Sequence, residues 1–160
     1  MVAAMLPLVA ATTNCHRTVR TSPVTAAPDS TRGIVSITGT SFEQSVMLRT
    51  DNGTLALAAN ASDSAALSRM GGIDVKVFGK HEPRRFRVVS FRAMTVSGAP
   101  VIDGVVREDD GKLSIETAEG RVALGNPPAR LRNLVGARVW IGGPPATGPN
   151  QFGVIAPATR

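Results

Sequence analysis

Few residues of this 160-residue chain have the types and spacing that catalysis or metal binding requires. The two histidines are His16 and His81, and the single cysteine is Cys15. They provide neither a zinc-ligand set nor a nucleophile with an adjacent base. The sequence also lacks a serine-hydrolase elbow, a phosphate-binding loop, a zinc-protease helix and a Cys-x-x-Cys pair. We therefore predict a non-enzymatic protein with no metal and no cofactor.

Arginine is the chemically most suggestive residue type, and it is concentrated in the segment RRFRVVSFR at residues 84–92. If this segment alternates as a strand, Phe86 points inward while Arg85 and Arg87 point outward. Arg85, Arg87 and Arg92 would then form a basic ridge able to bind phosphate, acidic sugars or anionic lipid head groups. The alternative is a solvated strand face whose arginines blunt an exposed edge. We favour that alternative because arginine is mostly a surface residue.

Trp140 is the only tryptophan of the chain. On a strand it lies on the side opposite to its apolar neighbours Val139 and Ile141, so it should emerge on the outside of its unit. An outward tryptophan is either a ligand anchor or a residue buried in a seam between two folded units. We favour the seam.

The elements that must position these residues are short strands. Apolar alternation punctuated by glycine predicts strands near residues 33–39, 45–50, 54–59, 73–79 and 85–93. A helix within residues 62–72, capped by Ser62 or Asp63, is predicted between the third and fourth strands. The Asp-Asn-Gly turn at residues 51–53 predicts a hairpin between the second and third strands.

A second set of segments repeats the first. TDNGTLAL at residues 50–57 returns as TAEGRVAL at residues 117–124. Without a gap, Leu67, Met70, Gly72, Val75, Val77 and Gly79 match Leu131, Leu134, Gly136, Val139, Ile141 and Gly143. The second copy predicts strands near 101–107, 112–117, 121–125, 137–142 and 151–156, with a helical turn at 129–135. Matches in the same order indicate an internal repeat.

Five strands with a helix between the third and fourth resemble the OB-fold, a small Greek-key barrel. We therefore predict an all-β fold of two tandem, five-stranded OB-like barrels, at residues 33–98 and 99–157, which pack on each other. Each copy is small enough to be only marginally stable alone.

The net charge of +6 raises the question of a nucleic-acid partner. OB-folds bind single strands through aromatic side chains on the outer face of their second and third strands. With Val46, Leu48, Leu55 and Leu57 in the core, that face carries Met47, Arg49, Thr54 and Ala56, and in the repeat Ser114, Glu116, Arg121 and Ala123. None of these is aromatic, so nucleic acid is an improbable partner.

The beginning of the sequence suggests export. Residues 1–14 carry no charged side chain, and their apolar run has the length of the hydrophobic region of a secretory signal peptide. The segment LVAATTNC at residues 8–15 resembles a bacterial lipoprotein signal, which implies that Cys15 is the acylated residue. The alternative is plain cleavage of a signal peptide without lipidation. Residues 15–32, rich in Thr, Ser, Pro and Ala, have the composition of a disordered tether.

Together these features predict a non-enzymatic binding or scaffold lipoprotein, held by Cys15 in the periplasm or outer membrane of a bacterial cell envelope. Its partner would be an envelope protein or an anionic ligand. One alternative is a basic OB-fold protein of the cytosol that binds single-stranded nucleic acid. Another is a module that binds anionic glycans or lipid surfaces.

Overall fold

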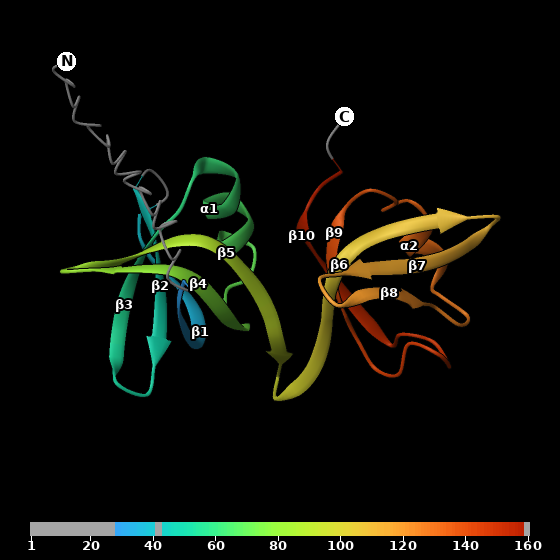
Figure 1. Cartoon of the computed structure of the whole chain (residues 1–160), viewed down its shortest axis with the longest axis horizontal. Helices are drawn as coiled ribbons and strands as arrows, with labels where there is room; N and C mark the ends of the chain where they lie inside the picture. Colours follow the sequence, from blue (N-terminus) through green and yellow to red (C-terminus); the bar gives the residue numbers. More distant parts are fainter. Residues whose placement is uncertain (1–27, 41–42, 159–160) are drawn as a thin grey trace, which may run out of the picture.

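Strands dominate the structure, a computed structural model that describes residues 28–40 and 43–158. Within these ranges the chain forms ten strands and two short helices (Figure 1), which confirms the all-β class. Neither helix has the length or the apolar content needed to cross a membrane. The predicted signal peptide (1–14), Cys15 and the predicted tether as far as residue 27 lie outside the described residues.

The first five strands form a closed barrel. They are β1 (Asp29–Gly39), β2 (Gln44–Thr50), β3 (Gly53–Ala58), β4 (Asp74–Glu82) and β5 (Arg85–Val96). Around the barrel the order is β1-β2-β3-β5-β4 and back to β1, and every neighbouring pair is antiparallel except β3 and β5. The prediction of a closed five-stranded barrel is therefore confirmed for this part of the chain.

The first strand begins earlier than the sequence suggested. β1 starts at Asp29, and residues 29–32 pair in register with Gly79 to Lys76 of β4. The prediction that the tether continues to residue 32 is therefore wrong for these four residues. Their polar side chains carry no strand-like periodicity, and it is backbone pairing with a distant strand that orders them.

Alternating apolar side chains fill the barrel. Leu48, Val75 and Phe86 have no exposed surface. Leu55 and Leu57, which were predicted to lie in the core, are only half-buried at its margin. The strand alternation is therefore as predicted, while the depth of burial of Leu55 and Leu57 depends on what covers β3.

Helix α1 (Ala61–Ser68) lies between β3 and β4, as predicted. Its Leu67 side chain is fully buried in the barrel core. The N-cap is Asn60, whose side-chain oxygen accepts a hydrogen bond of 2.8 Å from the Asp63 N–H. The predicted caps were wrong: the Ser62 hydroxyl donates to that same oxygen, and Asp63 lies in the first turn.

Five further strands follow the same order. They are β6 (Ala99–Asp109), β7 (Lys112–Thr117), β8 (Gly120–Ala123), β9 (Arg138–Gly142) and β10 (Gln151–Ala156), with helix α2 (Ala129–Arg132) between β8 and β9. All are antiparallel and run β8-β7-β6-β9-β10 across the sheet. This order matches β3-β2-β1-β4-β5 of the barrel.

The second set of strands does not close, so the prediction of a second complete barrel is not confirmed. No pairing joins β8 to β10 in the described chain. The segment that should continue β10 toward β8 contains Pro144, Pro145 and Pro149, and proline has no N–H for a strand ladder. One backbone hydrogen bond crosses the gap instead, from the Gly125 N–H to the Pro145 carbonyl at 2.8 Å.

Matched positions of the two sets make the same local bonds. The Thr50 hydroxyl donates to the Gly53 carbonyl at 3.0 Å, and the Thr117 hydroxyl donates to the Gly120 carbonyl at 2.8 Å. Both glycines have positive φ, at 126° and 135°, a conformation that side chains disfavour. The Thr-x-x-Gly pattern in both copies therefore specifies the same hairpin turn.

The two sets of strands pack against each other, as predicted from the sequence. We call residues 29–96 the first unit and residues 99–156 the second unit. A two-residue turn, Ser97 and Gly98, joins β5 to β6. Ile155 of β10 is fully buried in the core cluster of the first unit, and α1 and β10 face each other across the middle of the molecule (Figure 1).

Candidate functional site

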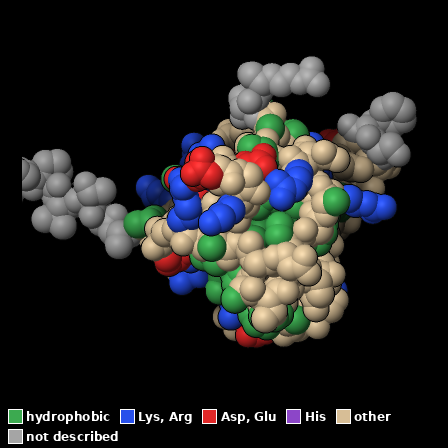
Figure 2. Space-filling model, turned by 90° about the vertical axis from the view of Figure 1, so that its right-hand side faces the viewer, with side chains coloured by type: hydrophobic (Ala, Val, Ile, Leu, Met, Phe, Trp, Pro, Cys, Tyr) green, Lys and Arg blue, Asp and Glu red, His purple; other side chains and the backbone are tan. Residues whose placement is uncertain are grey.

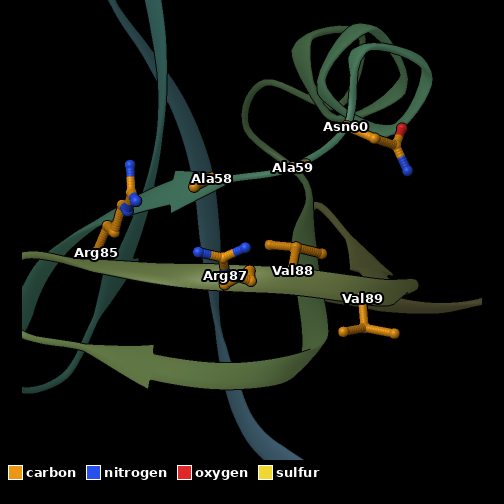
Figure 3. A pocket seen from close by; sticks show the side chains of 7 residues that line it. All are labelled: Ala58, Ala59, Asn60, Arg85, Arg87, Val88 and Val89. Carbon is orange, nitrogen blue, oxygen red and sulfur yellow. The ribbon is translucent and has the colours of Figure 1, made fainter.

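An open pocket of about 560 Å³ lies where β3 and β5 run parallel. Its walls are the end of β3, the helix cap Asn60 and the first half of β5. Figure 3 shows Arg85 and Arg87 on β5, with their guanidinium groups directed toward the end of β3. The pocket therefore combines two cationic groups with a small polar side chain and short apolar ones.

Strand alternation places the two arginines. Phe86 and Val88 are buried in the barrel, whereas the residue before each of them, Arg85 or Arg87, is exposed. This is the alternation that the sequence predicted. After Val88 the strand bulges, because Phe78 lies opposite Ser90 while Gly79 lies opposite Val88.

Glu82 binds both arginines. Its two carboxylate oxygens accept hydrogen bonds from Arg85 Nε at 2.7 Å and from Arg87 Nε at 2.6 Å. The hydrogen bonds from Arg85 and then Arg87 lower the pKa of the Glu82 carboxyl group below its ordinary value. Two guanidinium groups share one carboxylate, so the cluster keeps one net positive charge toward an anion in the pocket.

Arg92 does not join this cluster. It lies beyond the bulge, lines the cleft between the two units, and forms an ion pair with Glu119 in the β7–β8 turn. The predicted basic ridge is therefore divided: Arg85 and Arg87 lie together, and Arg92 faces the second unit. Charges of opposite sign also lie side by side on the end of the molecule seen in Figure 2, where Lys and Arg accompany Asp and Glu.

Trp140 does not line the pocket that holds Arg85 and Arg87. It is half-buried and packs against the core cluster of the first unit, between Asp103 of β6 and Gly153 of β10 in the sheet register. A Cβ atom on Gly153 would come within 2.5 Å of the indole nitrogen. This position between the units agrees with the preferred interpretation of Trp140 as a seam residue.

The cleft between the units contains a charge pair that was not among the predicted site residues. Arg138 donates to both carboxylate oxygens of Asp103 at 2.8 Å, and the Asp103 side chain is only 3% exposed. Asp103 also accepts the Ala93 N–H at 2.8 Å, and Arg138 donates to the Phe91 carbonyl at 2.5 Å. The guanidinium carbon lies 4.4 Å from the centre of the Phe91 ring.

A signal for this pair was present in the repeat. Asp103 matches Arg32, and Arg138 matches Asp74, so the two copies carry opposite charges at the same two positions. Arg32 and Asp74 also form an ion pair, with Arg32 Nη2 2.6 Å from Asp74 Oδ2. An exchange of sign at paired positions predicts contact between them.

The outer face of the second and third strands of each unit was expected to lack aromatic groups. Met47 and Ala56 are half-buried there, and Arg49 is exposed. Ser114 of β7 departs from the prediction, because it is buried and its hydroxyl has no hydrogen-bond partner among the described residues. In both units this face carries charged and aliphatic or small polar side chains and no aromatic one among the positions named.

The described ranges hold no cluster of three or more His, Cys, Asp or Glu side chains placed to bind a metal ion. Comparisons of this chain with protein-family models, with curated proteins and with solved structures gave no match.

Proposed function

We propose that this chain is a non-enzymatic binding or scaffold protein of a bacterial cell envelope, built from two OB-like units and anchored by a lipid on Cys15. The closed barrel has the strand order β1-β2-β3-β5-β4 with a helix between β3 and β4, which is the arrangement that suggested an OB-fold. The second unit repeats that order with a reduced closure. The fold alone assigns no ligand.

The observation that carries the scaffold proposal is the bonded and packed junction of the two units. Asp103 and Arg138 bond to the backbone of β5, and Ile155 enters the core of the first unit. A short turn and a buried charge pair leave little freedom for the units to move apart. Such a pair presents surfaces at a defined spacing, which suits a scaffold.

Fractionation of the cells tests the envelope location. With Cys15→Ala, the protein should move from the membrane fraction to the soluble periplasm or the medium, because the lipid chains supply the membrane affinity. Labelled fatty acid should enter the wild-type chain and not the variant. An unchanged distribution without incorporation of label would reject the anchor.

Anion binding at the β3–β5 pocket is a second candidate function. It is favoured by one observation: Arg85 and Arg87 share the single carboxylate of Glu82 and face an open pocket. Acidic glycans, lipid phosphates and single-stranded nucleic acid all present the required charge. Without aromatic stacking we expect weak binding that is indifferent to sequence and is lost near physiological salt.

A further inference from the structure

The second unit contacts the first unit through one face, and the first unit has an open copy of that face at the matching repeat positions. All seven residues that line an open pocket of about 470 Å³ on β1, β2 and β4 are repeat counterparts of the seven that the second unit contributes to the cleft. The repeat matches four of these residues in order to four of the second unit: Arg32 to Asp103, Ile34 to Val105, Arg49 to Glu116, and Asp74 to Arg138. The registers agree, since Gly33 lies opposite Val75 and Gly104 opposite Val139.

In the second unit this face binds the edge of β5, which is a strand of the first unit. β3 pairs with β5 only at residues 85–87, so among the described residues the outer edge of β5 beyond that point has no strand neighbour until β6. Asp103 accepts the N–H of Ala93 and Arg138 donates to the carbonyl of Phe91. One carboxylate–guanidinium pair thus satisfies both kinds of backbone group on an open edge.

In the first unit the guanidinium group of the corresponding pair is exposed, while Asp74 is 19% exposed and also accepts a hydrogen bond of 3.2 Å from the Thr95 hydroxyl. Arg32 donates to both carboxylate oxygens of Asp74, and the Arg32 side chain is 53% exposed. Beside it Ile34 is among the few exposed large apolar residues, and Arg49 has no ion-pair partner in the described part of the chain. The donor and the acceptor are exchanged relative to Asp103 and Arg138. A strand bound to Arg32 and Asp74 would therefore run in the opposite direction to β5 on Asp103 and Arg138.

The second unit carries the matching open edge. Phe152 and Val154 lie opposite Ile141 and Val139, as Phe91 and Ala93 lie opposite Val77 and Val75. β10 pairs only with β9, and no side chain in the described ranges bonds to the Phe152 carbonyl or the Val154 N–H. An open pocket of about 650 Å³ adjoins Phe152.

We propose that these two surfaces bind each other between copies of this chain: the Arg32–Asp74 pair of one copy caps the β10 edge of the next. Among the described residues, each copy has one such pair with an exposed guanidinium group and one uncapped edge, so the contact joins different surfaces head to tail. The outward Ile34 would cover apolar surface of the neighbouring copy. This assembly is independent of the proposed envelope function and of the anion pocket.

Disulfide trapping tests the geometry of the contact. Full-length Cys15→Ser chains carrying either Ile34→Cys or Gln151→Cys are mixed and mildly oxidised. Disulfide-linked dimers of the two different variants should form faster than dimers of either variant with itself. Replacing Gln151→Cys by Lys112→Cys, an exposed position on β7, provides the matched control. Mixed dimers no more abundant than in the control would overturn the proposal.

Sedimentation of the reduced, full-length protein tests its energetics. A contact of this limited size should be weak, with a dissociation constant on the order of 10⁻⁴ M. Arg32→Ala should weaken association about tenfold, because losing one charge-assisted hydrogen bond has that effect. Arg121→Ala, which removes another exposed ion pair, should not change it. The proposal fails if the wild-type chain stays monomeric at every concentration, or if both variants associate equally.

Discussion

At the residue scale, the same two side-chain types serve different purposes according to their burial. Arg121 and Asp109 form an ion pair in which both side chains are more than half exposed, and water screens their attraction. Asp103 is almost fully buried and binds Arg138 together with a backbone N–H. The burial of the Glu82 carboxylate lies between these extremes, since its side chain is 20% exposed. It binds two exposed arginines beside a pocket.

Removing the two pocket arginines should weaken anion binding. For a single-stranded oligonucleotide, Arg85→Gln with Arg87→Gln should reduce the slope of log affinity against log salt by about 1.4, since two phosphate contacts are lost. Fluorescence anisotropy over a salt series measures this slope. Arg107→Gln with Arg121→Gln removes the same charge from the second unit and serves as the control. Equal slopes for both double variants would exclude the pocket as the binding site.

Glu82 should make a small, acid-sensitive contribution to stability. Because Arg85 and Arg87 lower the pKa of Glu82 in the folded chain below its ordinary value of 4.5, this contribution is complete above that value. It is lost as the pH falls through the lowered folded-state pKa. Glu82→Gln should therefore flatten the dependence of the melting temperature on pH below about 4.5. If the melting temperatures of variant and wild type fall equally with pH, the ion-pair assignment is contradicted.

At the element scale, the two units differ most where β8 should meet β10. The barrel closes through parallel pairing of Ala56–Ala58 with Arg85–Arg87. In the second unit the corresponding stretch is a proline-containing loop that offers one closing hydrogen bond. Its core of Ile115, Leu131 and Ile141 is nevertheless fully buried. The second unit is therefore closed by less backbone pairing than the barrel.

Core truncations at matched strand positions test whether the two units unfold together. Leu48 in β2 and Ile115 in β7 are both fully buried. Leu48→Ala and Ile115→Ala should each lower the free energy of unfolding by about 2–5 kcal/mol, through lost burial and a new cavity. Both variants should still unfold in one transition, because the units share a core residue, Ile155. Two separate transitions in urea would show that the units fold independently.

At the scale of the whole molecule, one buried charge pair and one strand determine how the units sit together. Arg138 and Asp103 bond to the edge of β5, and Arg69 donates to the Ile155 carbonyl at 3.3 Å. The pair replaces the hydrogen bonds that an additional strand would make. Its loss would leave the Ala93 N–H and the Phe91 carbonyl without these partners.

Breaking this pair should loosen the units. Asp103→Ala should cost about 2–4 kcal/mol, because it leaves the partly buried guanidinium group of Arg138 without a counter-ion. Asp109→Ala, which removes an exposed carboxylate, should cost about 0–1 kcal/mol. Trp140 reports the motion, since it is the only tryptophan and packs against the first unit. Acrylamide should quench its fluorescence more in Asp103→Ala than in Asp109→Ala, and equal quenching would contradict the proposed lock.

The sequence by itself determined the local features of this protein. Alternation in residues 84–92 placed Arg85 and Arg87 outside and Phe86 inside, because neighbouring side chains of a strand point to opposite faces. The glycines at 53 and 120 identified matching turns, because the required φ is strained for other residues. These properties depend on residues close together in the chain.

Only the tertiary structure decided which distant groups meet. It showed that residues 29–32 extend β1, that Arg92 pairs with Glu119, and that the second unit stays open between β8 and β10. It also brought Asp103 and Arg138 to the edge of β5. Each of these outcomes depends on pairing between segments remote in sequence, for which neither periodicity nor local propensity carries information.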